Sequence, residues 1–182
     1  FQPFVFENTF NLGDLKNARN CKKAIESAEN VVVIGSGATG VECAFELKEF
    51  GLDVTIVEYF ERVLPSFSYR VSSFVKKERI KVLTSCKVVG VNEFVRTSRG
   101  EIDCDLAISC AGVIPNVIDG LKVEKKGIVV DEYLRAKDNI FAIGDCANVC
   151  IDGKIATKTA YEAEMQARYT AKNVERLEKG EK

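Results

Sequence analysis

Residues 30–58 of the chain, NVVVIGSGATGVECAFELKEFGLDVTIVE, decide the fold class. Residues 31–34 are a β-branched apolar run, which is typical of a strand buried on both faces. A glycine-rich segment and an apolar helical pattern follow, and Gly51 ends that pattern. Residues 53–58 repeat the buried-strand pattern. A strand, a glycine loop, a helix and a strand within about 30 residues predict a βαβ unit, which is almost always right-handed and parallel.

The glycine segment over residues 35–40, GSGATG, has the spacing of a dinucleotide-binding fingerprint. It directly follows a predicted strand and begins a predicted helix, which is the context that makes the motif informative. Gly35 permits the tight turn, Gly37 lets a pyrophosphate approach the backbone, and Gly40 lets the helix pack closely on the strand. The N–H groups and the positive end of the helix are therefore expected to bind a diphosphate.

Glu58 and Arg62 bear on which dinucleotide would bind. Glu58 ends the second strand, where a carboxylate can accept hydrogen bonds from the adenosine ribose and would repel a 2′-phosphate. The alternative is a glycine-rich turn beside a solvated strand-end glutamate. Glu58 favours NADH over NADPH, whereas Arg62 could pair with a 2′-phosphate or form a surface ion pair with Glu58 or Glu61.

The remaining sequence predicts the other elements of an α/β fold. The first 20 residues are expected to be a lead-in, with a helix from Gly13-Asp14 to about Ile25. A helix is predicted over residues 68–79, and residues 81–110 predict an antiparallel meander that ends in a buried strand. Short strands are predicted over residues 127–130 and 139–143, and a final helix has apolar residues at helical spacing: Ala160, Ala163, Ala167, Ala171, Val174 and Leu177.

Composition excludes several classes of function. Hydrophobic residues make up 46% and charged residues 29%, as in ordinary globular domains. With 26 Lys and Arg against 27 Asp and Glu, the net charge is −1, so no basic field exists to bind nucleic acid. No run approaches the roughly 20 apolar residues of a membrane helix, and no signal peptide opens the chain, so we expect a cytoplasmic protein with no membrane partner.

The 7 cysteines favour a reducing compartment where thiols stay free. Their spacing gives no metal template and the chain has 0 histidines, so no metal is expected. Cys43 follows the fingerprint closely and could be a redox thiol near a helix N-terminus, or a small residue on the apolar face.

Three motifs together resemble a known family. Residues 30–65 resemble the NAD(P)H domain of the FAD-dependent pyridine nucleotide-disulfide oxidoreductases, which include NADH oxidases, coenzyme A disulfide reductases and ferredoxin reductases. Residues 109–116, SCAGVIPN, look like the segment that leads back to the FAD domain. Residues 139–147, NIFAIGDCA, are similar to the family's second FAD motif. The resemblance covers nearly the whole chain and implies a Rossmann-like three-layer NAD(P)-binding domain with a parallel sheet and a β-meander, plus part of an FAD domain.

The resemblance implies site residues but no catalytic residue. Glu42 would reach toward the nicotinamide or simply complement the helix dipole. Gly112 would let the dinucleotide lie close, and Asp145 would bind the ribityl or diphosphate part of FAD. The final helix, which is expected to begin near residues 157–159, would stabilise reduced flavin or serve only in packing. The full candidate set is Gly35, Ser36, Gly37, Ala38, Thr39, Gly40, Glu42, Glu58, Arg62, Gly112, Gly144 and Asp145.

The implied organisation is a lead-in over residues 1–25, an NAD(P)H-binding domain over residues 26–113 and an incomplete C-terminal part of an FAD domain over residues 114–182. The family's other FAD-domain half and its interface domain, which often forms a homodimer, would be partners. The implied function is hydride transfer from NADH to FAD and on to an unidentified acceptor, and the chain alone is expected to be inactive. Two alternatives are a nucleotide-sensing module without turnover and a simple Rossmann NAD-dependent dehydrogenase.

Overall fold

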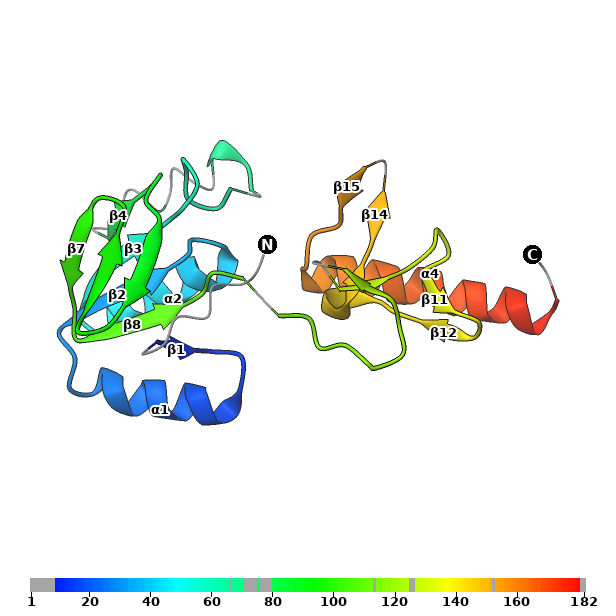
Figure 1. Ribbon diagram of the computed structural model, residues 1–182, viewed down its shortest axis with the longest axis horizontal. Helices are drawn as coiled ribbons and strands as arrows, with labels where there is room; N and C mark the ends of the chain where they lie inside the picture. The colour runs from blue at the N-terminus through cyan, green and yellow to red at the C-terminus, as the bar shows by residue number, and fades with distance from the viewer. Residues whose placement is uncertain are drawn as a thin grey trace. The chain divides into compact units, whose positions relative to one another are not determined.

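The computed structural model describes residues 9–65, 67–70, 75, 80–112, 114–124, 127–151 and 153–180. Two compact units divide the chain, and the boundary falls between residues 113 and 114 (Figure 1). The elements of the first unit are β1 (Phe10–Asn11), α1 (Leu15–Ile25), β2 (Asn30–Ile34), α2 (Ala38–Glu49), β3 (Asp53–Val57), β4 (Lys81–Leu83), β5 (Val88–Val91), β6 (Phe94–Thr97), β7 (Gly100–Asp103) and β8 (Leu106–Ser109).

A five-stranded sheet in the order β1-β8-β2-β3-β4 forms the centre of the first unit. Every neighbouring pair in it is parallel. Strands β5, β6 and β7 form a separate antiparallel sheet. The predicted parallel sheet and meander are therefore confirmed, but β4, which was expected to begin the meander, is a parallel edge strand of the central sheet. Strand β1, which pairs with β8, is an element that the sequence did not predict.

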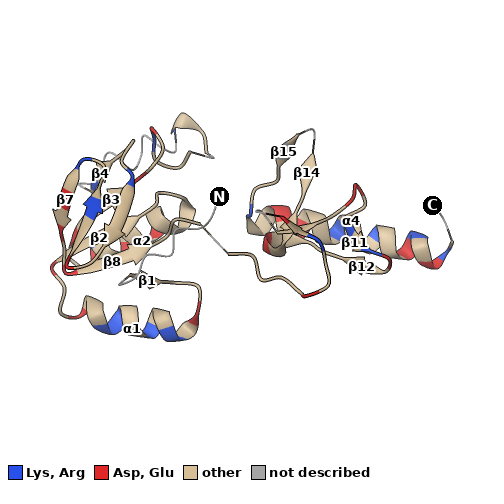
Figure 2. Ribbon diagram, viewed as in Figure 1, with Lys and Arg blue, Asp and Glu red and all other residues tan. Residues whose placement is uncertain are grey.

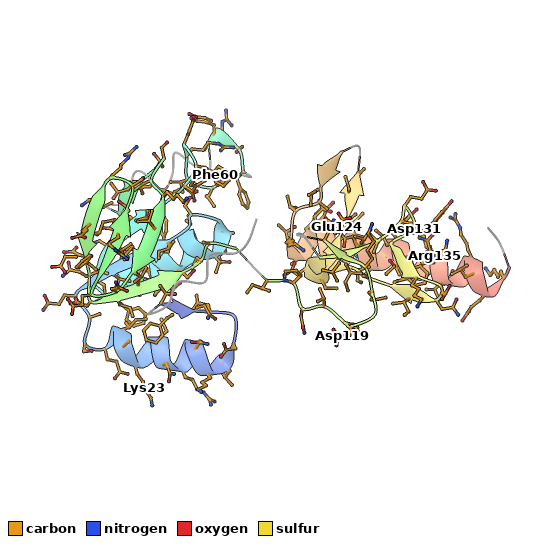
Figure 3. All side chains as sticks on the ribbon, viewed as in Figure 1. Lys23, Phe60, Asp119, Glu124, Asp131 and Arg135 are labelled. Carbon is orange, nitrogen blue, oxygen red and sulfur yellow. The ribbon has the colours of Figure 1, made fainter. Side chains whose placement is uncertain are left out.

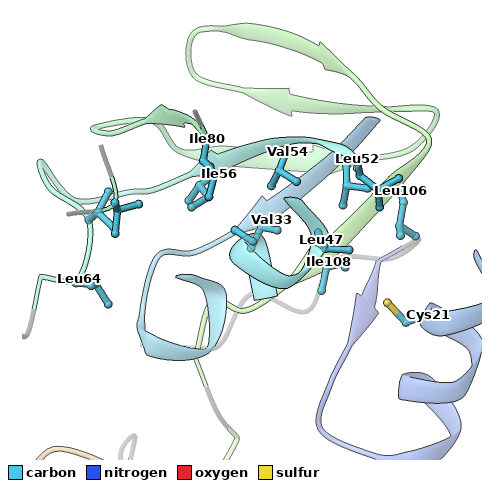
Figure 4. Packing of buried hydrophobic residues seen from close by; sticks show 14 residues of the cluster. Cys21, Val33, Leu47, Leu52, Val54, Ile56, Leu64, Ile80, Leu106 and Ile108 are labelled. Atoms are coloured by element: carbon cyan, nitrogen blue, oxygen red, sulfur yellow. The ribbon is translucent and has the colours of Figure 1, made fainter. Parts of the chain in front are cut away.

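The two faces of the parallel sheet are covered by different layers. Along β2, Val31 and Val33 belong to a core cluster with Leu47 of α2. Figure 4 shows Val33 beside Leu47 in this cluster. Val32 instead packs in a second cluster with Val95 of the meander. Because successive side chains of a strand point to opposite faces, the run that predicted a doubly buried strand supplies both cores. The predicted three-layer α/β fold is confirmed.

Two polar side chains fix the beginnings of elements in this unit. Asp14 is the N-cap of α1, where its Oδ1 accepts the N–H of Asn17 at 2.8 Å. This bond from the backbone of Asn17 lowers the pKa of the Asp14 carboxyl. Asp105, just before β8, accepts the N–H groups of Glu29 and Asn30 at 2.9 and 2.8 Å. The start of β2 is thereby tied to the start of β8.

The expected lead-in is partly regular structure. Phe10 of β1 and Ile25 of α1 pack against the first core cluster, so this segment is part of the folded first unit. The outward side of α1 is basic, and Lys22 and Lys23 in its last turn complement the helix dipole (Figure 2). Most of the helix predicted over residues 68–79 lies outside the described residues.

The second unit is built of short strands and one long helix. Its small sheets have the orders β13-β10-β9, β11-β12 and β14-β15. Its elements are β9 (Val123–Glu124), β10 (Gly127–Val129), β11 (Arg135–Lys137), β12 (Ile140–Phe141), a 3₁₀ turn η1 (Gly144–Cys146), β13 (Ala147–Asn148), β14 (Cys150–Ile151), β15 (Lys154–Ile155) and α4 (Ala160–Glu178).

The buried side chains of α4 are polar ones, not the apolar ones at helical spacing. Gln166 accepts the N–H of Gly144 at 2.7 Å, and Asn173 donates to the carbonyl of Tyr133 at 3.0 Å. Val174 and Leu177 stay 39% and 41% exposed. The apolar spacing of α4 therefore does not mark the face that packs within this unit.

The turn between β10 and β11 carries the labelled ion pair of Figure 3, in which Arg135 lies 3.2 Å from Asp131. Among the helices of the described part of the chain, none has the length and apolar character needed to cross a lipid bilayer.

Candidate dinucleotide-binding site

Gly35 makes the turn between β2 and α2 under two constraints. Its φ is +96°, a conformation that residues with a side chain rarely adopt. A Cβ atom at this position would lie 2.8 Å from the carbonyl oxygen of Cys110. The N–H of Gly35 donates to the carbonyl of Val57 at 2.8 Å. The loop is thus held between the ends of β3 and β8.

Gly40 and Gly37 are glycines for different reasons. Gly40 is buried in the first turn of α2, and a Cβ there would collide with the carbonyl oxygen of Gly35. Gly37 has an ordinary φ of −64° and no heavy atom within 4 Å of an added Cβ. Packing therefore explains why residue 40 is a glycine but not why residue 37 is one. The absence of a side chain at Gly37 leaves the N-terminus of α2 open.

The first turn of α2 presents unpaired N–H groups at that opening. The first helical hydrogen bond runs from the N–H of Val41 to the carbonyl of Gly37 at 3.0 Å, and no side chain caps the helix. Among the described residues, no acceptor meets the N–H groups of Gly37, Ala38, Thr39 or Gly40. Four such groups at a positive helix end are suited to an anion, so these residues fit a diphosphate.

Glu58 is a buried carboxylate that holds the fingerprint loop. Its side chain is 5% exposed. Its Oε2 accepts the N–H of Ser36 at 2.8 Å and the hydroxyl of Ser36 at 2.5 Å, and its Oε1 accepts the N–H of Phe60 at 2.8 Å. The alternative of a solvated strand-end glutamate is wrong. Since each carboxylate oxygen has two acceptor positions, Oε1 retains one for a further donor, and contact with a ribose stays a prediction.

Ser36 is a structural bridge within the candidate site. It is 0% exposed, and besides its two bonds to Glu58 its carbonyl accepts the N–H of Leu64 at 2.9 Å. Leu64 is itself buried and has a φ of +50°, so the loop after β3 holds a strained residue against the fingerprint. Ser36 was predicted as a cofactor contact, and its hydrogen bonds show that it positions the side chain of Glu58.

The guanidinium of Arg62 holds the same loop. Its nitrogens donate to the carbonyls of Pro65 at 2.5 Å and Phe67 at 2.8 Å, and the group lies 5.6 Å from the ring centre of Tyr69. A 2′-phosphate would therefore compete with contacts that this side chain already makes.

A depression of about 600 Å³ lies beside Glu58. Tyr59 and Phe60 contribute aromatic rings that meet edge to face with centres 5.4 Å apart (Phe60 is labelled in Figure 3). The sequence did not predict the more distant lining residues, because Ser85 and Lys87 come from the connection between β4 and β5 and Ser98 from the β6–β7 turn. The depression is lined by Tyr59, Phe60, Glu61, Arg62, Pro65, Ser85, Lys87 and Ser98.

Two further candidates of the first unit are open to solvent. Glu42 is exposed on α2. Gly112 is exposed with a φ of +118°, and nothing lies within 4 Å of an added Cβ. Gly112 directly follows Cys110 and Ala111, whose backbone atoms lie 2.8 and 3.0 Å from a Cβ added at Gly35.

Gly144 and Asp145 lie in the second unit and form part of the turn η1. Gly144 has a φ of +66°, and the side chain of Asp145 is exposed. Lys158 donates to the backbone carbonyls of Asp145 and Ala147, which fixes this turn beside the start of α4. Thr159 caps α4 by accepting the N–H of Glu162 at 3.3 Å, so the helix begins where the sequence predicted.

Comparison with known proteins identifies the family. The family model described as pyridine nucleotide-disulphide oxidoreductase matches residues 4–167. The chain belongs to this family. An NADH oxidase of Methanocaldococcus jannaschii is 34% identical over 97% of the chain, and rhodocoxin reductase of Rhodococcus erythropolis is 34% identical over 85%. The chain spans 46% and 40% of these two relatives.

Solved structures of pyridine nucleotide-disulphide oxidoreductases and related reductases share the fold. An NAD-dependent persulfide reductase from A. fulgidus superposes with a TM-score of 0.78 at 29% identity, over 93% of this chain and 35% of that one. The ferredoxin reductase for the CYP199A2 system of Rhodopseudomonas palustris gives 0.79 at 28% identity, over 93% of this chain and 46% of that one. The resemblance expected from the sequence is confirmed at the level of the family.

Proposed function

We propose that the chain is the NAD(P)H-binding portion of an FAD-dependent oxidoreductase that passes hydride from NADH to FAD and on to an unidentified acceptor. The observation that carries this proposal is the open first turn of α2, where the N–H groups of residues 37–40 meet no acceptor from the described part of the chain. A diphosphate supplies the negative charge and the acceptor oxygens that this helix end lacks.

The chain's own residues bind and orient the dinucleotide. Ala38 and Thr39 present backbone N–H groups to the diphosphate, and Ser36 keeps Glu58 fixed beside them. The remaining acceptor position on Glu58 receives a ribose hydroxyl. Gly112 leaves room for the dinucleotide, and Glu42 faces its nicotinamide end. The bound flavin supplies the redox chemistry, while the protein provides orientation and electrostatics.

NADH is preferred over NADPH in this proposal. The buried carboxylate of Glu58 repels a 2′-phosphate, and Arg62 is occupied by the carbonyls of Pro65 and Phe67. The depression lined by Tyr59 and Phe60 next to Glu58 would take the adenine ring between aromatic and aliphatic surfaces.

The second unit contributes Gly144 and Asp145 to one side of an FAD site. Large apolar side chains are exposed on this unit: Ile114 at 65%, Ile118 at 69% and Ile151 at 62%. Such exposure favours contact with further protein. We propose that the partner is the other half of the FAD domain, followed by an interface domain that forms a homodimer.

Calorimetric titration of the chain with NADH and with NADPH tests the proposal. We expect one NADH per chain and at least tenfold weaker binding of NADPH, which corresponds to a difference of about 1.4 kcal/mol in binding free energy. Titration with ADP-ribose, which keeps the diphosphate and both riboses but lacks nicotinamide, should give measurable binding too. Absence of NADH and ADP-ribose binding would contradict the proposed function, and tighter NADPH binding would contradict the preference.

A further inference from the structure

The outward face of α1 carries a group of exposed cations. Its members are Lys16, Arg19, Lys22 and Lys23, and the 11 residues of the helix include no Asp or Glu. Figure 2 shows the resulting basic band along α1, and Lys23, labelled in Figure 3, points away from the sheet. None of the ion pairs formed between described residues includes any of these four side chains. Their charge is therefore directed at solvent.

These charges work against the helix that carries them. Arg19 is separated from each of the other three cations by three or four positions, so like charges stand side by side on one face. Lys16 lies in the first turn, where the positive end of the helix dipole disfavours a cation. Lys22 and Lys23 complement the dipole in the last turn, which accounts for only half of the group. The stability of α1 therefore does not explain its basic face.

An apolar side chain lies among the cations. A depression of about 610 Å³ runs along this face, and its lining combines the four cations with Leu15, Asn20 and Glu26. Glu26 is the one carboxylate among the described residues that line it. Leu15 is 65% exposed, and Leu12, just before the helix, is 44% exposed. Exposed apolar groups within a charged rim are typical of a surface that contacts another protein.

Packing and charge favour a protein over the other polyanions that a basic face could bind. A helix that enters a lipid surface needs a free apolar face, whereas Cys21 of α1 is 2% exposed and Ile25 packs against the first core cluster. A nucleic acid extends beyond the roughly 16 Å that 11 helical residues cover. Because the whole chain has a net charge of −1, the rest of the molecule would not attract it. A compact acidic patch on a protein matches the size of this face.

We propose that the outward face of α1 is a docking surface for an acidic protein, whose carboxylates meet the four cations while an apolar side chain packs on Leu15. None of the residues of this surface lines the depression beside Glu58, so the docking does not depend on the proposed binding of NADH. Charge should steer the association and salt should weaken it, because exposed charges are screened over about 10 Å at 0.1 M ionic strength.

Fluorescence anisotropy of the whole chain with a labelled acidic peptide tests the surface. The probe carries Glu residues on both sides of a phenylalanine pair, and its control peptide has Gln in place of each Glu. We expect the Glu peptide to bind at least tenfold more tightly than the Gln peptide at low salt, and at least tenfold more weakly at about 200 mM than at about 20 mM salt.

Charge reversal on α1 is the decisive variant. Lys16→Glu combined with Arg19→Glu should weaken binding of the Glu peptide at least tenfold. Lys172→Glu combined with Arg176→Glu, at exposed positions of α4, changes the net charge equally and should keep the affinity within threefold. The α1 variant should unfold in urea at the same or a higher concentration than the parent, because an acid in the first turn complements the helix dipole. Loss of binding is thereby separated from loss of fold.

Leu15→Ser tests the apolar contact. It should weaken binding of the phenylalanine-containing probe several-fold and leave a probe with glycine in place of the phenylalanines unaffected. NADH affinity should be the same in the parent and in all of these variants. Failure of the proposed function would therefore leave the docking result standing, and failure of docking would leave the NADH result standing.

Three results would overturn the proposal. The first is equal binding of the Glu peptide to the parent and to the α1 double variant. The second is tighter binding to phosphatidylserine vesicles or to a double-stranded DNA oligomer than to the Glu peptide, which would assign the face to a lipid or a nucleic acid. The third is a dimer in gel filtration that the α1 double variant abolishes, which would assign the face to a second copy of the chain.

Discussion

Gly37 and Gly40 belong to one fingerprint but differ in what surrounds them. Open space lies in front of Gly37, whereas Gly40 touches the backbone of Gly35. We predict that Gly37→Ala changes the free energy of unfolding by less than about 1 kcal/mol, the range of N-cap substitutions. The same variant should weaken NADH binding about tenfold, because its methyl group occupies the path of the diphosphate.

Gly40→Ala is the matched comparison. Its methyl group would collide with a backbone carbonyl, so we expect a loss of about 1–3 kcal/mol in the free energy of unfolding, as in an overpacked core. Urea unfolding and calorimetric titration of both variants measure the two effects. A Gly37→Ala protein that binds NADH normally would contradict the assignment of the open space to the ligand.

The bridge between Ser36 and Glu58 gives a second prediction. Ser36→Ala removes the hydroxyl that donates to Oε2 but keeps the backbone N–H that does so too. We expect a loss of about 1–2 kcal/mol in unfolding free energy, the size of a hydrogen bond to a charged group. NADH binding should weaken several-fold because Glu58 is less firmly held. Ser27→Ala, at an exposed serine just after α1, is the control and should leave affinity within twofold; unchanged stability in Ser36→Ala would contradict the bridge.

At the scale of single residues, the sequence predicted the features of the site that depend on local spacing. The three glycine functions follow from the motif, and the close contacts of Gly35 and Gly40 agree with them. It did not predict that the carboxylate of Glu58 turns inward onto Ser36, since nothing in the local pattern distinguishes a buried strand-end acid from a solvated one. The neighbour of Gly40 at Cys110 was equally hidden, because it comes from a strand far along the chain.

At the scale of elements, Asp105 connects the starts of β2 and β8. The backbone N–H groups of Asn30 and Glu29 lower the pKa of its carboxyl below the usual 3.8. A carboxyl whose pKa is lower in the folded state stabilises the fold above its unfolded pKa, and this contribution is lost as the pH falls through the folded value. We predict that Asp105→Asn is less stable than the parent at pH 7, and that the difference shrinks below about pH 4.

Thermal unfolding of both proteins between pH 7 and pH 3 measures this effect. Asp103→Asn is the control, because among the described residues no N–H group donates to the carboxylate of Asp103. If the difference in stability between Asp105→Asn and the parent stays constant down to pH 3, the charge of Asp105 does not contribute to the stability of the fold.

The elements themselves were predicted where their periodicity is strong. The doubly buried β2 and β3 carry continuous β-branched runs, and α2 lies between a glycine loop and Gly51. The two-residue β1 has too short a pattern to be seen, and it forms because β8 offers it an edge. In α4 the spacing of the apolar residues did not identify the buried face, because polar side chains bind the turns around Gly144 and Tyr133.

At the scale of the molecule, the chain matches only part of the length of its relatives. It spans less than half of the relatives compared above, and the second unit exposes many apolar side chains. We predict that the purified chain binds FAD weakly or not at all, because Asp145 and its turn would form only one side of the flavin site. Absorption spectra after incubation with FAD and gel filtration measure the retained flavin.

Stoichiometric yellow protein would contradict this prediction, since it would mean that the second unit holds flavin by itself. A longer version of the protein that supplies the other half of the FAD domain should retain flavin and become bleached on addition of NADH. The proposed division into an NAD(P)H-binding part and an FAD-binding part follows from the order of the motifs, which does not identify an electron acceptor.

The central claim is that the first turn of α2 binds the diphosphate of NADH, and amide chemical shifts test it most directly. In two-dimensional NMR spectra of ¹⁵N-labelled chain titrated with NADH, the amides of Gly37, Ala38, Thr39 and Gly40 should show the largest shift changes and saturate together. Saturable binding that leaves these four amides unshifted, with the changes located elsewhere in the chain, would contradict the account.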